Sequence, residues 1–218
     1  MAQTIVTQWL RQPSQARSQD TLDRILAAAE DFIATGRFER ATVAQLVKHA
    51  GTSVGAFYAR FSDKDALVHV LQERMVLRIE RAVRQLTDEA RWEGQPLTEV
   101  VHGVVAGLAR MFRLERSAFL GLAVGWRLPG RPHVLGRSRR INDLMWAGVE
   151  ALLIERLDEV AHPRPEVAIR VGLSMVVSTL REHLVFGARG LAPVGVSEDG
   201  LIPELATAYL SYLQGAQG

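Results

Sequence analysis

Residues 41–67 read A-T-V-A-Q-L-V-K-H-A-G-T-S-V-G-A-F-Y-A-R-F-S-D-K-D-A-L and contain two short helical patterns joined by a tight turn. Thr42 stands three residues before Gln45, a spacing typical of the capping box that begins a helix. Gly51 is placed to end that helix, and Ser53 to cap the next one. The pattern predicts a helix-turn-helix, whose second helix has the proportions needed to enter the major groove of DNA.

The second helix carries the residue types that such a role requires. Gly55 and Ala56 at its leading edge would let the backbone approach base edges, although a glycine inside a helix costs about 1 kcal/mol relative to alanine. The hydroxyl groups and positive charges around it would bind DNA phosphates. A tight crossing of two helices is the other explanation for Gly55. The predicted DNA-contacting residues are Thr42, Thr52, Ser53, Val54, Gly55, Ala56, Tyr58, Arg60 and Lys64.

The same stretch resembles the signature of the tetracycline-repressor (TetR) family of transcriptional regulators. The shared features are the capped helix, the A-G-x-S turn, glycine followed by an aromatic pair, and F-x-x-K, within residues 18–70. The resemblance implies that Tyr58 and Lys64 contact phosphates and that the residues from Thr52 to Ala56 face the groove. Val54 stands where many relatives carry lysine, which predicts fewer phosphate contacts and a methyl contact to thymine.

The rest of the chain shows helical periodicity and no sustained alternation typical of strands. We therefore predict an all-α fold of about nine helices, with an N-terminal arm and DNA-binding domain in residues 1–64. Residues 65–218 are predicted to form a ligand-binding and dimerisation domain. The predicted helices cover residues 20–35, 42–50, 53–60, 62–88, 96–112, 115–128, 131–159, 164–186 and 199–214.

Composition narrows the class of protein. The 218 residues include no cysteine, so disulfides, thiol nucleophiles and thiolate metal ligands are excluded. No uncharged stretch reaches the roughly 18 residues needed to span a bilayer, and no signal-peptide pattern begins the chain, which predicts a cytoplasmic protein. The net charge is +2, and residues 1–64 hold eight Lys and Arg against six acids, a weak indication of a polyanionic partner.

Motifs of enzymes are missing from the sequence. The six histidines are never closer than twenty residues, so none forms a metal-ligand pair on one helical face. No phosphate-binding glycine loop with lysine and no G-x-S-x-G motif occurs. We therefore expect no enzyme activity, metal or cofactor. Two pairs of glycines four residues apart, Gly103 with Gly107 and Gly121 with Gly125, are expected to allow close helix packing.

The C-terminal segment predicts self-association. Residues 164–186 are apolar on nearly every helical face, so this helix is expected to be buried on two sides. One side would face the protomer's core and the other an identical helix across a two-fold axis, with residues 199–214 completing a four-helix contact. Such a dimer sets two recognition helices about 34 to 36 Å apart and requires a roughly palindromic operator.

A ligand-binding role rests mainly on the family resemblance. The candidate pocket residues are Met111, Phe119, Trp126, Met145, Ser178 and His183, each of which could equally be core filler. The sequence thus predicts a homodimeric transcriptional repressor, bound to double-stranded operator DNA and released by a small, largely apolar effector. Two alternatives stay open: a helical enzyme or ligand carrier whose helix-turn-helix only serves packing, and a DNA-bound structural dimer without an effector.

Overall fold

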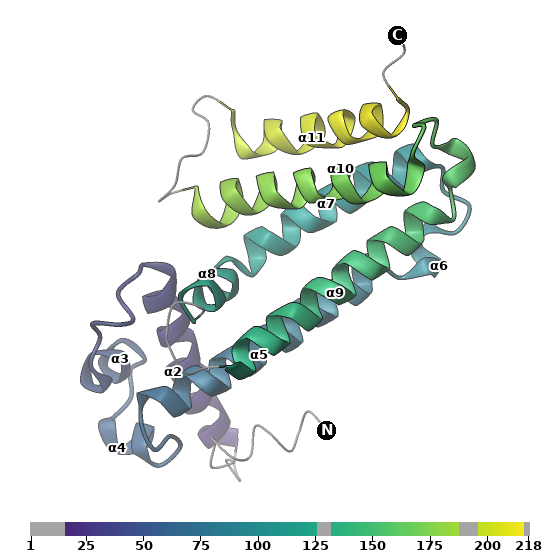
Figure 1. Ribbon diagram of the computed structural model, residues 1–218. Helices are drawn as coiled ribbons and strands as arrows, with labels where there is room; N and C mark the ends of the chain where they lie inside the picture. The colour runs from purple at the N-terminus through teal and green to yellow at the C-terminus, as the bar shows by residue number, and fades with distance from the viewer. Residues whose placement is uncertain (1–15, 126–131, 188–195, 216–218) are drawn as a thin grey trace. The chain divides into compact units, whose positions relative to one another are not determined.

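The computed structural model describes residues 16–125, 132–187 and 196–215, which form helices and no strand (Figure 1). The predicted all-α fold is therefore confirmed. Each long helix predicted from periodicity is present, and the N-terminal arm of residues 1–15 lies outside the described residues. The elements are α2 (Ala16–Ala34), α3 (Val43–His49), α4 (Val54–Tyr58), α5 (Lys64–Leu86), α6 (Glu89–Trp92), α7 (Leu97–Leu114), α8 (Arg116–Gly125), α9 (Pro132–Ile154), the 3₁₀ turn η1 (Leu157–Glu159), α10 (Pro165–Leu180), the π-helix η2 (Arg181–Phe186) and α11 (Glu198–Leu213).

The chain forms two compact units. Among the described residues, the first unit holds 16–77, 117–125 and 132–135, and the second holds 78–116, 136–187 and 196–215. The boundary therefore falls inside α5, whereas the sequence placed it at residue 64. Because α5 is one continuous helix, the same element contributes residues to both units.

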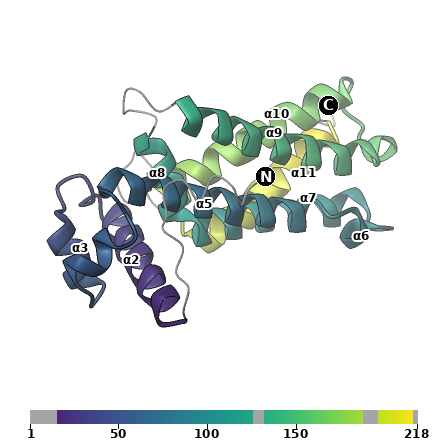
Figure 2. The same ribbon diagram turned by 90° about the horizontal axis from the view of Figure 1, so that it is seen from below.

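In the first unit, α2 supplies the apolar stripe on which the helix-turn-helix packs. Leu22, Ile25 and Leu26 are almost fully buried, as their spacing predicted. The helix ends at Gly36, whose φ of +69° is the left-handed conformation that glycine adopts without steric cost. Helix α3 lies against α2 in both views (Figures 1 and 2).

In the second unit, α7, α10 and α11 pack against one another (Figure 1). The close approach of α10 to α11 depends on Gly172, because a Cβ there would lie 2.1 Å from Cε2 of Tyr209. The buried Tyr209 hydroxyl donates a hydrogen bond to the carbonyl of Ile169 at 2.7 Å, and burial raises its pKa. On α7, Gly103 and Gly107 are contacted by Trp92 and Leu86, which confirms their predicted role in close packing.

Several boundaries differ from the predictions. The helix expected from residue 62 begins at Lys64, and its cap is Asp63, whose carboxylate accepts a hydrogen bond from the Ala66 amide at 2.7 Å. Ser62 instead donates to Asp63. The helix expected over 131–159 ends at Ile154, and the one over 164–186 changes to a π-helix at Arg181. The short α6 was not predicted.

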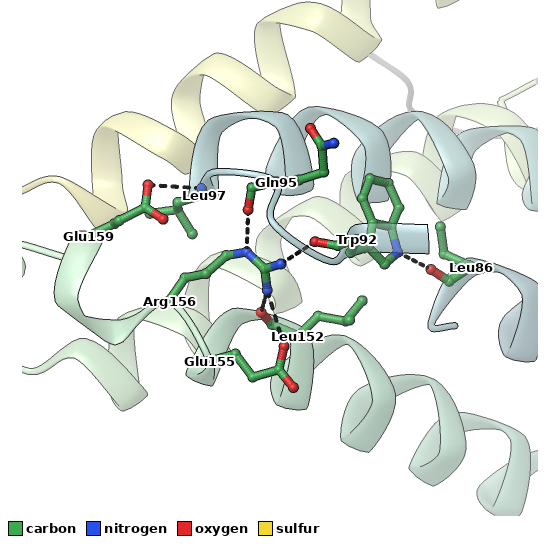
Figure 3. Close-up of polar contacts among 8 residues, drawn as sticks. All are labelled: Leu86, Trp92, Gln95, Leu97, Leu152, Glu155, Arg156 and Glu159. Atoms are coloured by element: carbon green, nitrogen blue, oxygen red, sulfur yellow. Dashed lines mark hydrogen bonds and ion pairs between the residues drawn. The ribbon is translucent and has the colours of Figure 1, made fainter. Parts of the chain in front are cut away.

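A buried arginine explains the position of α6 (Figure 3). Arg156, which is 8% exposed, donates hydrogen bonds to the carbonyls of Leu152, Trp92 and Gln95 at 2.5 to 2.7 Å. The Trp92 indole donates in turn to the carbonyl of Leu86 at 2.7 Å. These bonds attach the end of α9 to the α5–α7 connection and satisfy carbonyls that burial would otherwise leave unpaired.

Candidate nucleic-acid interface

The first helix of the pair, α3, begins with the predicted capping box. The Thr42 hydroxyl accepts a hydrogen bond from the Gln45 amide at 3.2 Å, and the Gln45 side chain accepts one from the Thr42 amide at 2.8 Å. Leu46 and Val47 are buried. This reciprocal bonding confirms the predicted start of the helix and fixes Thr42 at an exposed position.

The turn between the two helices is held by backbone geometry and by one arginine. Gly51 has φ +61°, and the Thr52 amide returns to the Val47 carbonyl at 2.9 Å, the bond that closes a Schellman motif. Arg24 on α2 donates to the Gly51 carbonyl at 3.0 Å. The turn is therefore attached to α2, a contact that the sequence analysis missed because it joins residues 27 positions apart.

The second helix, α4, is anchored on one side and open on the other. Ser53 caps it by accepting a hydrogen bond from the Ala56 amide at 3.1 Å, and the fully buried Phe57 ring lies 5.2 Å from that of Phe61. Val54 and Tyr58, one helical turn apart, are 42% and 50% exposed. An exposed valine and tyrosine on one face are a surface available to a partner.

Gly55 lies on this open surface. Among the described residues, the nearest atom to a Cβ built there is the Ser53 hydroxyl oxygen at 3.9 Å, so no described helix crosses close to it. The alternative explanation, a tight helix crossing, therefore does not account for this glycine. Of the other predicted contacts, Ser53 and Thr42 are exposed, while Thr52 and Ala56 are half-buried.

Two predicted phosphate contacts have different roles in the structure. Arg60 is 9% exposed and donates to the Ala56 carbonyl at 2.7 Å, so its side chain is not at the rim. Lys64 donates to the carbonyls of Phe38, Glu39 and Ala41 at 2.5 to 3.1 Å, and its ammonium lies 4.4 Å from the Phe38 ring centroid. An ammonium has three donors, so these carbonyls use its full hydrogen-bonding capacity.

The electrostatics at the start of α5 follow from these bonds. Burial lowers the pKa of Lys64, an effect that the carboxylates of Glu39 and Asp65 oppose. The hydrogen bond from Ala66, with further help from Ser62, lowers the pKa of Asp63. The ionised Asp63 carboxylate therefore caps α5 and interacts favourably with the positive end of the helix dipole.

The predicted effector residues that the structure describes have different surroundings. Met111 and Met145 are buried in the second unit, Ser178 is exposed on α10, and His183 is half-buried in the π-helix. Phe119 belongs to the first unit, and Trp126 lies outside the described residues. Ser178 points away from any interior site because α10 buries its opposite face.

The sequence around this interface matches a known family. Residues 25–71 match the family model described as bacterial regulatory proteins, tetR family. This segment belongs to the TetR family. The match covers the C-terminal part of α2, both helices of the helix-turn-helix and the start of α5.

Two curated relatives extend the comparison of this TetR-family chain. It is 37% identical over 54 residues to an uncharacterized HTH-type transcriptional regulator, YvdT, of Bacillus subtilis. This alignment covers 25% of the chain and 28% of that protein. It is 25% identical over 165 residues to the A-factor receptor protein of Streptomyces griseus, which covers 76% of the chain and 54% of that protein. The aligned parts thus span about a quarter and about half of these relatives.

Solved structures agree in fold over nearly the whole chain. The fatty acid degradation regulator FadR from Bacillus halodurans is 13% identical with a TM-score of 0.60, covering 94% of this chain and 99% of that one. The TetR family regulator PfmR from Thermus thermophilus is 17% identical with a TM-score of 0.63, covering 94% and 100%. Within the described residues, no helix is both long and apolar enough to cross a membrane.

Proposed function

We propose that this TetR-family chain is a cytoplasmic repressor that binds operator DNA through α4. The observation that carries the proposal is the open face of α4, where Val54 and Tyr58 are exposed and none of the helices that the structure describes packs on Gly55. A helix anchored by one buried aromatic residue and open on its other face is suited to enter the major groove. These features favour a regulator over a helical enzyme or carrier.

The proposed contacts divide into two kinds. Gly55, Val54 and Ala56 would approach base edges, with the Val54 methyls suited to a thymine methyl. The exposed hydroxyls of Thr42, Ser53 and Tyr58 would donate to phosphates and position the protein without reading sequence. Thr52, which is half-buried beside the turn, would assist these phosphate contacts.

A substitution at Gly55 tests the proposal. Gly55→Leu adds bulk where the fold is open, so thermal stability should be unchanged or slightly higher, because glycine is the weaker helix former by roughly 0.5 to 1 kcal/mol. Affinity for a duplex selected from a random pool should fall at least tenfold. Ala27→Leu, which adds similar bulk at an exposed position on α2, should keep full affinity. Equal affinities of the Gly55 variant and the wild type would contradict the proposed docking.

We further propose that the repressor is a homodimer through α10 and α11. Val167, Val171 and Met175 form a row at four-residue spacing on α10 and are 43%, 42% and 49% exposed. Their opposite face is buried, so the helix is apolar on two sides, as the sequence predicted. An exposed apolar row of this kind favours a self-complementary contact across a two-fold axis and hence a roughly palindromic operator.

Sedimentation tests the dimer. Val171→Glu would place a carboxylate in the contact and should shift the protein towards monomer at micromolar concentration, while Glu99→Gln at an exposed position on α7, outside the proposed contact, should not. A wild-type chain that sediments as a stable monomer would exclude the proposed interface.

Release by a small, largely apolar effector is the third part of the proposal. One relative is named a receptor for A-factor and one structural neighbour a regulator of fatty acid degradation, which supports a role in sensing small molecules. Helix α5, continuous from the Asp63 cap to Leu86, has residues in both units and is the element through which binding would act on DNA affinity. By linkage, operator DNA must then weaken effector binding by the same factor.

A further inference from the structure

A groove in the second unit has the form and charge of a ligand site. Its volume is about 280 Å³, close to the lower end of the range for small-molecule pockets. Three helices contribute to it: α5, α6 and α7. The lining residues are Ala82, Gln85, Leu86, Arg91, Gly103, Ala106, Gly107, Arg110, Met111, Leu114 and Glu115.

The groove exists because α7 presents small residues along one side. Gly103, Ala106 and Gly107 leave little side chain to occupy the space beside α5. Trp92 packs against Gly103 and Leu86 against Gly107, where a Cβ would lie 2.3 Å from the nearest side-chain atom, and Leu86 also lines the groove. Hydrocarbon surface therefore lines the base of the groove.

The charges around the groove are positive. Arg91 and Arg110 both line it and form no ion pair with a residue that the structure describes. The guanidinium of Arg91 lies 4.7 Å above the Trp92 ring, which holds it at the groove. Among the described lining residues the one carboxylate is that of Glu115, which is 14% exposed. It accepts hydrogen bonds from Arg78 at 2.8 and 3.1 Å, so its charge is already balanced.

An apolar edge lies beside these cations. Leu114 at the end of α7 is 73% exposed, whereas Met111, three residues earlier on the same helix, is 5% exposed. A ligand whose apolar body covers Leu114 and whose anionic group meets the arginines would remove apolar surface from water. It would also satisfy two guanidinium groups, which bind carboxylates through paired hydrogen bonds.

We infer that this groove binds a small organic carboxylate with an apolar body, its carboxylate at Arg91 and Arg110 and its hydrocarbon part along Gly107, Met111 and Leu114. Of the effector residues proposed from sequence that the structure describes, Met111 alone belongs to it. The inference gives the chemical class of the effector proposed above, and it rests on that proposal only for the link to DNA.

Calorimetry of the full chain with hexanoate tests the inference without DNA, so its outcome is separate from that of operator binding. Hexanoate should bind, while hexanamide, which has the same shape without the charge, should bind at least tenfold more weakly. Arg91→Gln combined with Arg110→Gln should lower hexanoate affinity at least tenfold. Ala106→Phe, at an exposed lining position, should abolish binding by filling the groove.

Arg139→Gln is the matched control, because it removes one exposed positive charge from α9, outside the groove. Thermal unfolding of each variant establishes that it is folded. Four results would overturn the inference: no heat of binding at about 10 mM hexanoate, equal affinities for acid and amide, full affinity in Ala106→Phe, or the same loss in Arg139→Gln as in the double variant. The opposite results support it.

Discussion

The role of Lys64 gives the sharpest prediction of the structure. Its ammonium donates to the carbonyls of Phe38, Glu39 and Ala41, which form the connection between α2 and α3. Lys64→Met keeps the length of the side chain and removes all three bonds. Hydrogen bonds to a charged donor contribute about 1.5 to 3 kcal/mol each when buried, and half-burial reduces this to roughly 1 kcal/mol. We expect a loss of about 2 to 3 kcal/mol in the free energy of unfolding.

Urea unfolding followed by circular dichroism measures this loss. Lys48→Met is the matched control, because Lys48 is exposed on α3 and its replacement should change stability by less than about 0.5 kcal/mol. Binding to a non-specific duplex at several salt concentrations measures the second consequence. Because the ammonium is occupied within the chain, Lys64→Met should keep the wild-type salt slope once the protein is folded.

The opposite pair of results would refute this interpretation. A phosphate contact contributes about 0.9 to the slope of log affinity against log salt concentration. Suppose that Lys64→Met unfolded at the same urea concentration as the wild type and that the salt slope of its DNA binding fell by about 0.9. The ammonium would then contact a DNA phosphate, as the family resemblance implied, rather than the α2–α3 connection.

Three further outcomes follow from other contacts. Arg156→Met leaves the buried carbonyls of Trp92 and Gln95 without their donor and should lower the free energy of unfolding by about 3 to 5 kcal/mol. Urea unfolding measures this loss, and a loss under about 1 kcal/mol would contradict the network. Because the folded-state pKa of Asp63 is lowered, its contribution to stability is complete above its ordinary pKa of 3.8 and is lost as pH falls through the lowered value. The thermal midpoint should thus fall more steeply below about pH 4 in the wild type than in Asp63→Asn. If the two proteins lost stability in parallel as the pH fell, Asp63 would not contribute in this way. Gly172→Ala should lower the free energy of unfolding by about 1 to 3 kcal/mol through overpacking against Tyr209, and an unchanged thermal midpoint would contradict this.

Much of the fold follows from information that is local in sequence. The capping box at Thr42, the caps at Gly36 and Ser53, and the apolar stripe from Leu22 involve residues within a few positions of one another. Such patterns depend on backbone hydrogen bonding and on the 3.6-residue period, so they can be recognised without tertiary structure. The side of α4 that faces DNA was expected for a different reason, because the small residues Gly55 and Ala56 and the family resemblance indicated it, not helical spacing alone.

The roles of charged side chains depended on the tertiary structure instead. Lys64 meets carbonyls 23 to 26 residues away, and Arg156 meets two carbonyls more than 60 residues away. A long cation can reach a phosphate, a ligand or a buried carbonyl, and its sequence neighbours are the same in each case. Only packing decides which acceptor lies within about 3 Å of it. The sequence by itself determined the helices and their order, because these depend on neighbouring residues. The tertiary structure decided which arginines and lysines are committed inside the protein and which, like Arg91 and Arg110, remain at a groove for a ligand.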